Sequence, residues 1–258
     1  MITKYVKLTL ITEALGLSPS DPEIYKTFIG RKLEEANKKT LEKEKKSRKK
    51  SSKDDTAKTE AEDNEKEELM KELSDSKIQK EIEALMIGDE TSEDGKRTVF
   101  PRDSKGRPMA WSYQWKGFFK DACAGLKRMK DEDIAKESIK LKNYKAIIDS
   151  SIFVYPDKIT IKTIGDIGVC ERPLRADTMQ GPRVALASSE TVPAGSYMEF
   201  YVVCPDVYGK VIDEWLHYGF FRGFSQWRNS GKGRFVVEIT DSKGFPDKRL
   251  MDPKYEQA

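Results

Sequence analysis

Cationic and aromatic side chains alternate along one glycine-rich stretch of the chain, from Gly219 to Ile239. Its cations are Arg222, Arg228, Lys232 and Arg234, its aromatic residues are Phe220, Phe221, Phe224, Trp227 and Phe235, and its glycines are Gly219, Gly223, Gly231 and Gly233. Cations can follow a phosphate backbone, aromatic faces can stack on bases, and glycines let peptide N–H groups approach phosphates. The stretch therefore has the composition of a surface for single-stranded nucleic acid.

A structural interpretation of the same stretch stays open. We predict that Phe220, Phe221 and Trp227 pack in the core, and the glycines could serve only to form a tight turn between a helix and a strand. For the basic turn from Gly231 to Arg234 we favour a nucleic-acid contact. The turn is not a Walker loop, because Lys232 is not followed by serine or threonine and the glycines follow a helix instead of preceding one.

A second segment, Glu171–Gly195, places arginines among small and turn-forming residues. The Gly-Pro pair at 181–182 predicts the tip of a hairpin, with Arg172 and Arg175 on the strand that enters it and Arg183 just past it. A guanidinium stays charged and its fork matches two phosphate oxygens, so arginines on a projecting hairpin suit phosphate binding. The alternative is that these arginines pair with acidic residues of the same hairpin.

These segments need strands to hold them, and the alternation of apolar and polar residues predicts several. The expected strands span Lys4–Thr12, Ile152–Tyr155, Ile159–Ile161, Tyr197–Cys204 and Arg234–Ile239. The second and third are separated by a Pro-Asp pair, so they form either one interrupted strand or a hairpin.

Apolar residues at helical spacing predict two clear helices. One covers Trp115–Met129 and the other Tyr208–Gly219, and both apolar stripes are expected to pack on the sheet. A helix start signal at 20–22 predicts an earlier helix, and the residues at 98–108 predict a loop or short hairpin.

A highly charged stretch at 38–94 interrupts this order. It consists mostly of Lys, Glu, Asp, Ser and Thr, and it cannot bury enough apolar surface to offset the entropy lost on ordering. We therefore expect a charged, largely mobile or helical insertion in a single domain that spans 1–258. The remaining order predicts an α+β fold. A ferredoxin-like (RRM-like) antiparallel sheet with helices on one face and a projecting β-hairpin fits it, as do other α+β topologies.

Composition limits the classes of function. From Arg97 onward, 27 Lys and Arg stand against 21 Asp and Glu, and the whole chain carries a formal charge of +3, so the modest basic excess lies in the part predicted to fold. Three scattered cysteines and a single histidine argue against a zinc site, and we expect no cofactor. The sequence has neither a signal-peptide pattern nor a long apolar run, so we expect a cytoplasmic protein without a membrane partner.

Four segments together resemble the RAMP superfamily, the ferredoxin-like proteins that form RNA-guided CRISPR effector complexes. They are the strand KLTLITEAL, the helix YQWKGFFKDACAGL, the hairpin RPLRADTMQGPRVALASSETVPAGSYMEFYV and the turn NSGKGRFVVEI. In backbone subunits of such complexes the helix commonly begins with a Lys-Gly step, here Lys116 and Gly117, and the late turn commonly reads GxGR, here Gly231 to Arg234. On this resemblance Lys116 joins the expected RNA contacts.

The resemblance implies an RRM-like subunit of antiviral defence that binds RNA along its sugar-phosphate backbone, with a thumb hairpin between bases. Its partners would be single-stranded RNA, copies of itself and other effector subunits. Carried over, the resemblance places Arg172, Arg175 and Arg183 at the thumb, and Lys232 and Arg234 on the glycine-rich loop. Because the long insertion departs from the family's pattern, a stand-alone or phage-borne relative that binds single-stranded DNA in recombination or replication is an alternative.

An enzymatic function is the less favoured alternative. Some RAMP proteins cut RNA with a histidine or an aspartate, so a metal-independent endoribonuclease would use His217, the only histidine, or Asp21. His217 lies off the apolar stripe of its helix and Pro22 after Asp21 indicates a helix start, so we name no catalytic residue. A protein-interaction subunit that binds through the insertion and the hairpin is a third class.

Overall fold

A computed structural model of the protein describes residues 1–19, 97–131, 133–178 and 181–243. The chain divides into two compact units, one made of Met1–Ser18 and Arg97–Ala258 and the other of Pro19–Lys96. The helix expected from the start signal at 20–22 and the insertion at 38–94 lie outside the described residues. The single domain with an insertion therefore stays a prediction.

A six-stranded antiparallel sheet forms the centre of the first unit, in the strand order β11-β1-β10-β7-β5, with β6 also paired to β10. Its strands are β1 (Ile2–Leu10), β5 (Met109–Trp111), β6 (Phe153–Tyr155), β7 (Lys158–Lys162), β10 (Tyr197–Cys204) and β11 (Phe235–Lys243). Because β6 and β7 both pair with β10, the two short predicted runs are one interrupted strand and not a hairpin.

The alternating residues that predicted these strands are the ones that line the core. Val6 and Leu8 of β1 are fully buried opposite Phe200 and Met198 of β10. The same face of the sheet therefore carries the apolar side chains of both central strands, as the period of two requires.

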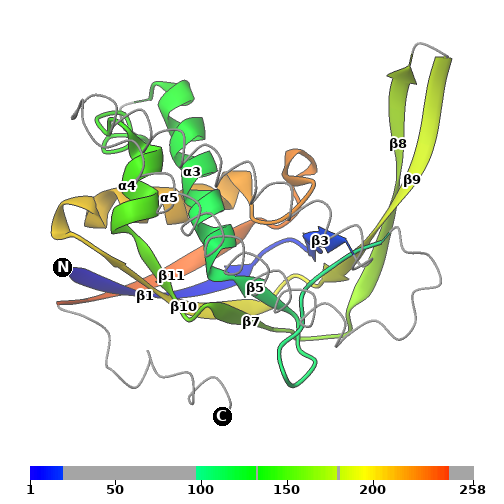
Figure 1. The fold of residues 1–258 in the computed structure, drawn as a ribbon, viewed down its shortest axis with the longest axis horizontal. Coiled ribbons are helices and arrows are strands. Elements are labelled where there is room, and N and C mark those ends of the chain that lie inside the picture. The colour runs from blue at the N-terminus through cyan, green and yellow to red at the C-terminus, as the bar shows by residue number, and fades with distance from the viewer. Residues whose placement is uncertain (20–96, 132, 179–180, 244–258) are drawn as a thin grey trace, which may run out of the picture. The chain divides into compact units, whose positions relative to one another are not determined.

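Three helices of the described residues cover this apolar face: α3 (Ser112–Met129), α4 (Tyr144–Ser151) and α5 (Gly209–Arg222) (Figure 1). Trp115 of α3 lies at the centre of the core, stacked on Phe200 at 4.8 Å and on Phe224 at 4.4 Å between ring centroids. Both predicted helices are confirmed, whereas α4 was not predicted. It has eight residues and only Ile148 is buried, so its apolar periodicity is too short to recognise.

The connectivity confirms the α+β prediction and is that of a ferredoxin-like fold. Apart from the short β5 and α4, the elements of this sheet and its helices are, in chain order, β1, α3, the interrupted strand β6/β7, β10, α5 and β11, which is a βαββαβ sequence. Numbered within that sequence, the strands lie in the sheet in the order 4-1-3-2, with all neighbours antiparallel.

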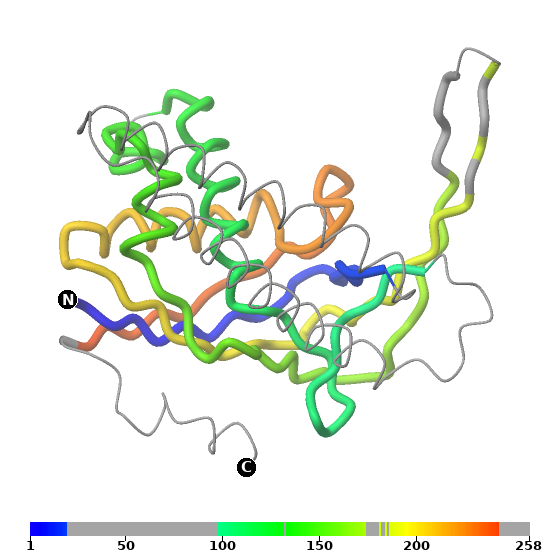
Figure 2. The backbone as a smooth tube through the Cα atoms, in the orientation of Figure 1, coloured from blue at the N-terminus to red at the C-terminus, as the bar shows by residue number. Residues whose placement is uncertain are grey.

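A second sheet carries the predicted hairpin. Its strands are β2 (Ala14–Leu15), β3 (Ser18–Pro19), β4 (Arg97–Val99), β8 (Gly168–Thr178) and β9 (Gly181–Val192). The long antiparallel pair β8 and β9 extends well past the six-stranded sheet (Figures 1 and 2). The projecting hairpin is thus confirmed, and its base is held by β2 and β4, which both pair with β9. The segment at 98–108 also forms the expected loop, closed by a bridge between Arg102 and Pro108.

Candidate functional site

The two segments singled out in the sequence meet at the base of the hairpin. The guanidinium carbon of Arg172, on β8, lies 5.0 Å from the centroid of the Trp227 ring, in the loop between α5 and β11. Arg172 also donates from Nη1 to Ser189 Oγ at 3.2 Å and from Nη2 to Gln226 Oε1 at 3.3 Å. We call Arg172, Ser189, Gln226 and Trp227 the junction, because they join the hairpin to the glycine-rich loop.

Trp227 holds a strained backbone conformation at the junction. Its φ is +53°, and Ser225 two residues earlier has a φ of +80°. Such left-handed conformations are rare for residues with a bulky side chain and cost of order 1–3 kcal/mol, and they persist only where surrounding contacts enforce them. The Trp227 side chain is 41% exposed even though it packs on Arg172. An aromatic ring is therefore presented to solvent next to a cation.

The prediction that three aromatic residues pack in the core is wrong. Phe220, Phe221 and Trp227 are 48%, 60% and 41% exposed. The buried stripe of α5 ends at Gly219, and each residue turns about 100° around the helix, so the next two side chains point away from the sheet. Trp227 lies beyond the helix and packs on Arg172 instead of on the core.

The glycines of the loop are needed for close packing. Gly233 has a φ of +69°, and a Cβ atom there would lie 1.8 Å from the carbonyl oxygen of Phe224. Its N–H donates to the Glu13 carbonyl at 2.8 Å, and the N–H of Gly231 donates to the Arg228 carbonyl at 2.9 Å. Because these amides bond within the protein, a phosphate at this turn would be bound by side chains.

The two basic side chains of the turn differ in their ion pairing. Lys232 Nζ is paired with the Glu13 carboxylate. Arg234 is exposed, and among the described residues its guanidinium has no ion-pair partner. Its backbone is fixed, since its N–H donates to Thr12 Oγ1 at 2.8 Å and its carbonyl accepts from the Ile11 N–H at 2.8 Å. Arg234 is therefore a free cation on a rigid turn.

Arg222 and Arg228 are both bound to one carboxylate that the sequence did not single out. Asp121 Oδ2, on α3, accepts from Arg222 Nε at 2.9 Å and from Arg228 Nη1 at 2.7 Å. Arg222 Nη1 also donates to Asn229 Oδ1 at 2.9 Å. We call Asp121, Arg222 and Arg228 the clasp. Nothing marked Asp121 in the sequence, because it is a single acidic residue off the apolar stripe of its helix.

The remaining predicted site residues lie on β8, β9 and α3. Arg175 and Arg183 lie farther along the hairpin strands, where the register pairs Arg175 with Val184 and Arg183 with Ala176. Lys116 Nζ lies 5.4 Å from the Phe153 ring centroid. Partial burial disfavours the charged form of the Lys116 side chain and lowers its pKa below the usual range. Sequence reasoning also missed Gln226, which contacts Arg172.

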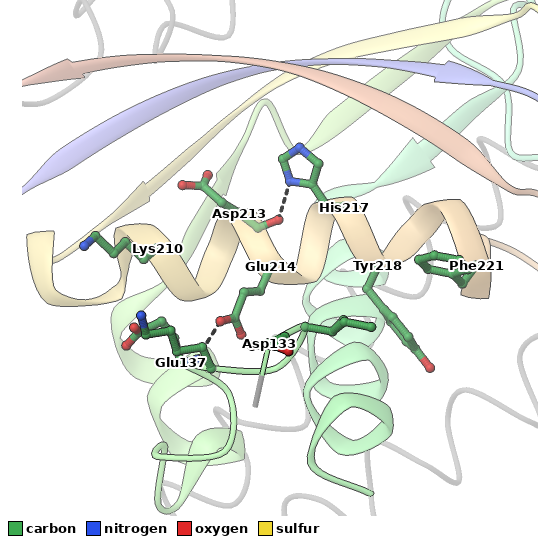
Figure 3. A pocket seen from close by; sticks show the side chains of 10 residues that line it. Asp133, Glu137, Lys210, Asp213, Glu214, His217, Tyr218 and Phe221 are labelled. Carbon is green, nitrogen blue, oxygen red and sulfur yellow. Dashed lines mark hydrogen bonds between the residues drawn. The ribbon is translucent and has the colours of Figure 1, made fainter. Parts of the chain in front are cut away.

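His217, the candidate for an enzymatic function, lines a pocket of about 470 Å³ between α5 and the segment after α3 (Figure 3). Its Nδ1 lies 2.8 Å from the carbonyl oxygen of Asp213, so the ring bonds to its own helix. The nearby carboxylates have structural partners, since Asp213 pairs with Lys4 and Glu214 accepts from the Glu137 N–H at 2.6 Å. None of these contacts orients His217 for acid-base chemistry.

Within residues 1–19, 97–131, 133–178 and 181–243, no group of three or more His, Cys, Asp and Glu side chains could hold a metal ion. No helix in these ranges is both long and apolar enough to cross a membrane.

No protein-family model matches the chain, and no curated protein matches its sequence. Among solved structures, the chain is similar to a chain of the type III-B Cmr-beta complex bound to cognate target RNA, with 11% identity, a TM-score of 0.43, and coverage of 93% of this chain and 60% of that chain. It is also similar to a chain of a type IV-B CRISPR complex, with 7% identity, a TM-score of 0.41, and coverage of 97% and 99%. The chain therefore spans 60% of the length of the first of these.

Proposed function

We propose that this protein binds single-stranded nucleic acid, with RNA favoured over DNA, along its backbone and with little sequence preference. The observation that carries the proposal is the Arg172–Trp227 contact, which joins two basic segments more than fifty residues apart into one surface. A cation and an exposed aromatic ring side by side match the two parts of a nucleotide, the phosphate and the base.

The junction is suited to stacking. The Trp227 ring packs on the Arg172 guanidinium and is still 41% exposed, so a base can extend the stack on the exposed part of the ring. The ring is held by the backbone and by Arg172 before any ligand arrives, so little conformational entropy is lost on binding. Stacking tolerates all four bases, because each has a π face.

Phosphate contacts would come from the cations on either side of the junction. Arg234 stands exposed on the turn next to the loop, and Arg175 and Arg183 lie on the hairpin strands beyond Arg172. Cations on both sides of the stacking residue would suit a strand that crosses the base of the hairpin. Lys232 and the clasp arginines are already paired, so they contribute less to phosphate binding.

We further propose that the chain is a RAMP-type protein that works as a subunit of an RNA-guided effector complex in the cytoplasm. The ferredoxin-like strand order, the projecting hairpin and the glycine-rich turn between α5 and β11 support this assignment. In such an assembly the partners would be RNA, other subunits and further copies of this chain. A stand-alone single-stranded DNA binder is distinguished from it by the nucleic acid that co-purifies and by the nuclease that removes it.

The proposal is tested by binding of fluorescently labelled oligouridylate and oligothymidylate to the full chain, measured by anisotropy. Arg172→Ala and Arg234→Ala should each weaken binding. Arg234→Ala should also reduce the slope of log K against log salt by about 0.7, the value for one lost phosphate contact on a single strand. Lys136→Ala, which removes an exposed cation on the segment after α3, is the matched control and should bind as the parent does. Equal affinities of all four proteins would refute the proposed surface.

A further inference from the structure

The clasp connects the loop that carries Trp227 to a helix of the core. Asp121 lies in α3, Arg222 is the last residue of α5, and Arg228 begins the short turn Arg228–Ser230 directly after Trp227. All three side chains are about 28% exposed, so the carboxylate sits between two guanidiniums at the rim of the core. One carboxylate oxygen thus bonds to both ends of the loop that connects α5 to the turn.

Trp227 is the residue that this arrangement constrains. A bulky residue with φ of +53° relaxes to another conformation unless its neighbours prevent it. On the N-terminal side, Ser225 Oγ donates to the Leu15 carbonyl and Gln226 bonds to Arg172. On the C-terminal side, the side chain of Arg228 is fixed by Asp121 at 2.7 Å. The clasp therefore supplies the side-chain constraint on the residue that follows Trp227.

We infer that Asp121 is a positioning residue for the single-strand site. Its carboxylate fixes Arg228 and Arg222, and these hold the Trp227 backbone in the conformation that stacks the ring on Arg172. The two arginines then act through Trp227, whereas the sequence predicted that they contact the nucleic acid directly. The inference rests on the proposed function for its effect on binding, but the positioning itself can be measured without nucleic acid.

Two opposing effects decide whether removal of the Asp121 carboxylate strengthens or weakens the binding of nucleic acid. Removing Asp121 takes away a negative charge near a polyanion, which favours binding. That charge is partly exposed and is already shared by two guanidiniums, so solvent and salt screen it within about 8 Å at physiological ionic strength. Releasing the loop misplaces the stacking ring directly and frees two long side chains. The loss of position should therefore outweigh the gain in charge.

The positioning is tested first in the absence of nucleic acid, by acrylamide quenching of tryptophan fluorescence in the full chain. Trp111, Trp115 and Trp215 are buried, so Trp227 is the accessible tryptophan of the described residues. Asp121→Ala and Asp121→Asn should both increase quenching, whereas Asp121→Glu should be quenched as little as the parent. Trp227→Phe gives the quenching of the other tryptophans, and circular dichroism checks that each variant is folded. Parent-like quenching in both Asp121→Ala and Asp121→Asn would overturn the inference.

The link to binding is tested with the labelled oligouridylate. Asp121→Asn and Arg228→Ala should each weaken binding about tenfold, the loss of much of one base-stacking contact, with an unchanged salt slope. Tighter binding by Asp121→Asn, or a reduced slope for Arg228→Ala, would contradict the positioning role. If the parent chain binds no oligonucleotide, the proposed function fails, while the quenching experiment still decides whether Asp121 positions Trp227.

Discussion

The guanidinium of Arg172 lies 5.0 Å from the centroid of the Trp227 ring, and this contact joins the hairpin to the loop between α5 and β11. Neither residue reaches the other by local geometry, because one lies on β8 and the other follows α5. The contact therefore depends on the whole ferredoxin-like core, which fixes where the hairpin base and the loop lie.

Trp227→Ala should weaken binding of single strands by about 1–3 kcal/mol, the value of one base stacked on an aromatic residue. The melting temperature of the variant should change little, because the Trp227 ring is 41% exposed and alanine keeps the Cβ atom, so the backbone strain at the positive φ stays the same. Phe221→Ala is the matched control, since it removes an exposed aromatic ring on α5 that packs on Phe220. Isothermal titration of both variants with oligouridylate checks this, and an equal loss in the two would show that Trp227 has no special part.

Arg175→Ala combined with Arg183→Ala should weaken binding and flatten its salt dependence. Both residues lie on the hairpin strands beyond the junction, so each is expected to bind one phosphate of a strand that follows the hairpin. The slope of log K against log salt should fall by about 0.7 for each arginine. Measurements of anisotropy between low and physiological salt test this, and a parallel loss of affinity at every salt concentration would show that these arginines do not neutralise phosphates.

Gly233→Ala should destabilise the protein by several kcal/mol. Its φ is +69°, and the added methyl group would lie 1.8 Å from the Phe224 carbonyl oxygen, so the turn must rebuild. Gly117→Ala, inside α3, is the opposite case, because a Cβ there meets no atom within 4 Å and glycine costs a helix roughly 0.5–1 kcal/mol relative to alanine. Urea unfolding should show a lower midpoint for the first variant and a higher one for the second. A Gly233→Ala protein as stable as the parent would disprove the close packing of the turn.

The hydrogen bond of Tyr5 should contribute to the free energy of unfolding at neutral pH, and this contribution should disappear at high pH. The Tyr5 hydroxyl donates to Glu199 Oε1 at 2.6 Å, and this bond, with burial, raises the pKa of Tyr5 to about 12. A raised pKa means that the folded state holds the proton more tightly, so the stabilisation is present below pH 10 and is lost as the pH rises toward 12. The difference in unfolding free energy between the parent and Tyr5→Phe should therefore shrink between pH 10 and 12. A constant difference over that range would contradict the bond.

The sequence predicted correctly those strands and helices whose periodic apolar residues are the ones buried in the core. Val6, Leu8 and Phe200 alternate with polar residues along their strands and fill the core. The eight-residue α4 was not predicted, because it has one buried residue, Ile148, and one residue shows no periodicity.

The site was predictable in its parts but not in its assembly. Interleaved cations and aromatic residues identified the loop, and arginines around a Gly-Pro turn identified the hairpin. The Arg172–Trp227 contact, however, joins residues that no local pattern relates. The exposure of Phe220 and Phe221 was missed because apolar residues favour the core on average, while the helix geometry after Gly219 turns these two outward. Asp121 could not be identified, because its role depends on two arginines that approach it from other elements.

The central claim is that single-stranded nucleic acid stacks at the Arg172–Trp227 contact. The most direct test is ultraviolet cross-linking of an oligouridylate that contains 4-thiouridine, followed by mass spectrometry of the cross-linked peptides. The account predicts that the main cross-linked peptide contains Trp227 and that Trp227→Ala abolishes this product. Cross-links found only elsewhere, such as on Tyr5 or Tyr201 of the helix-free face of the sheet, would contradict it.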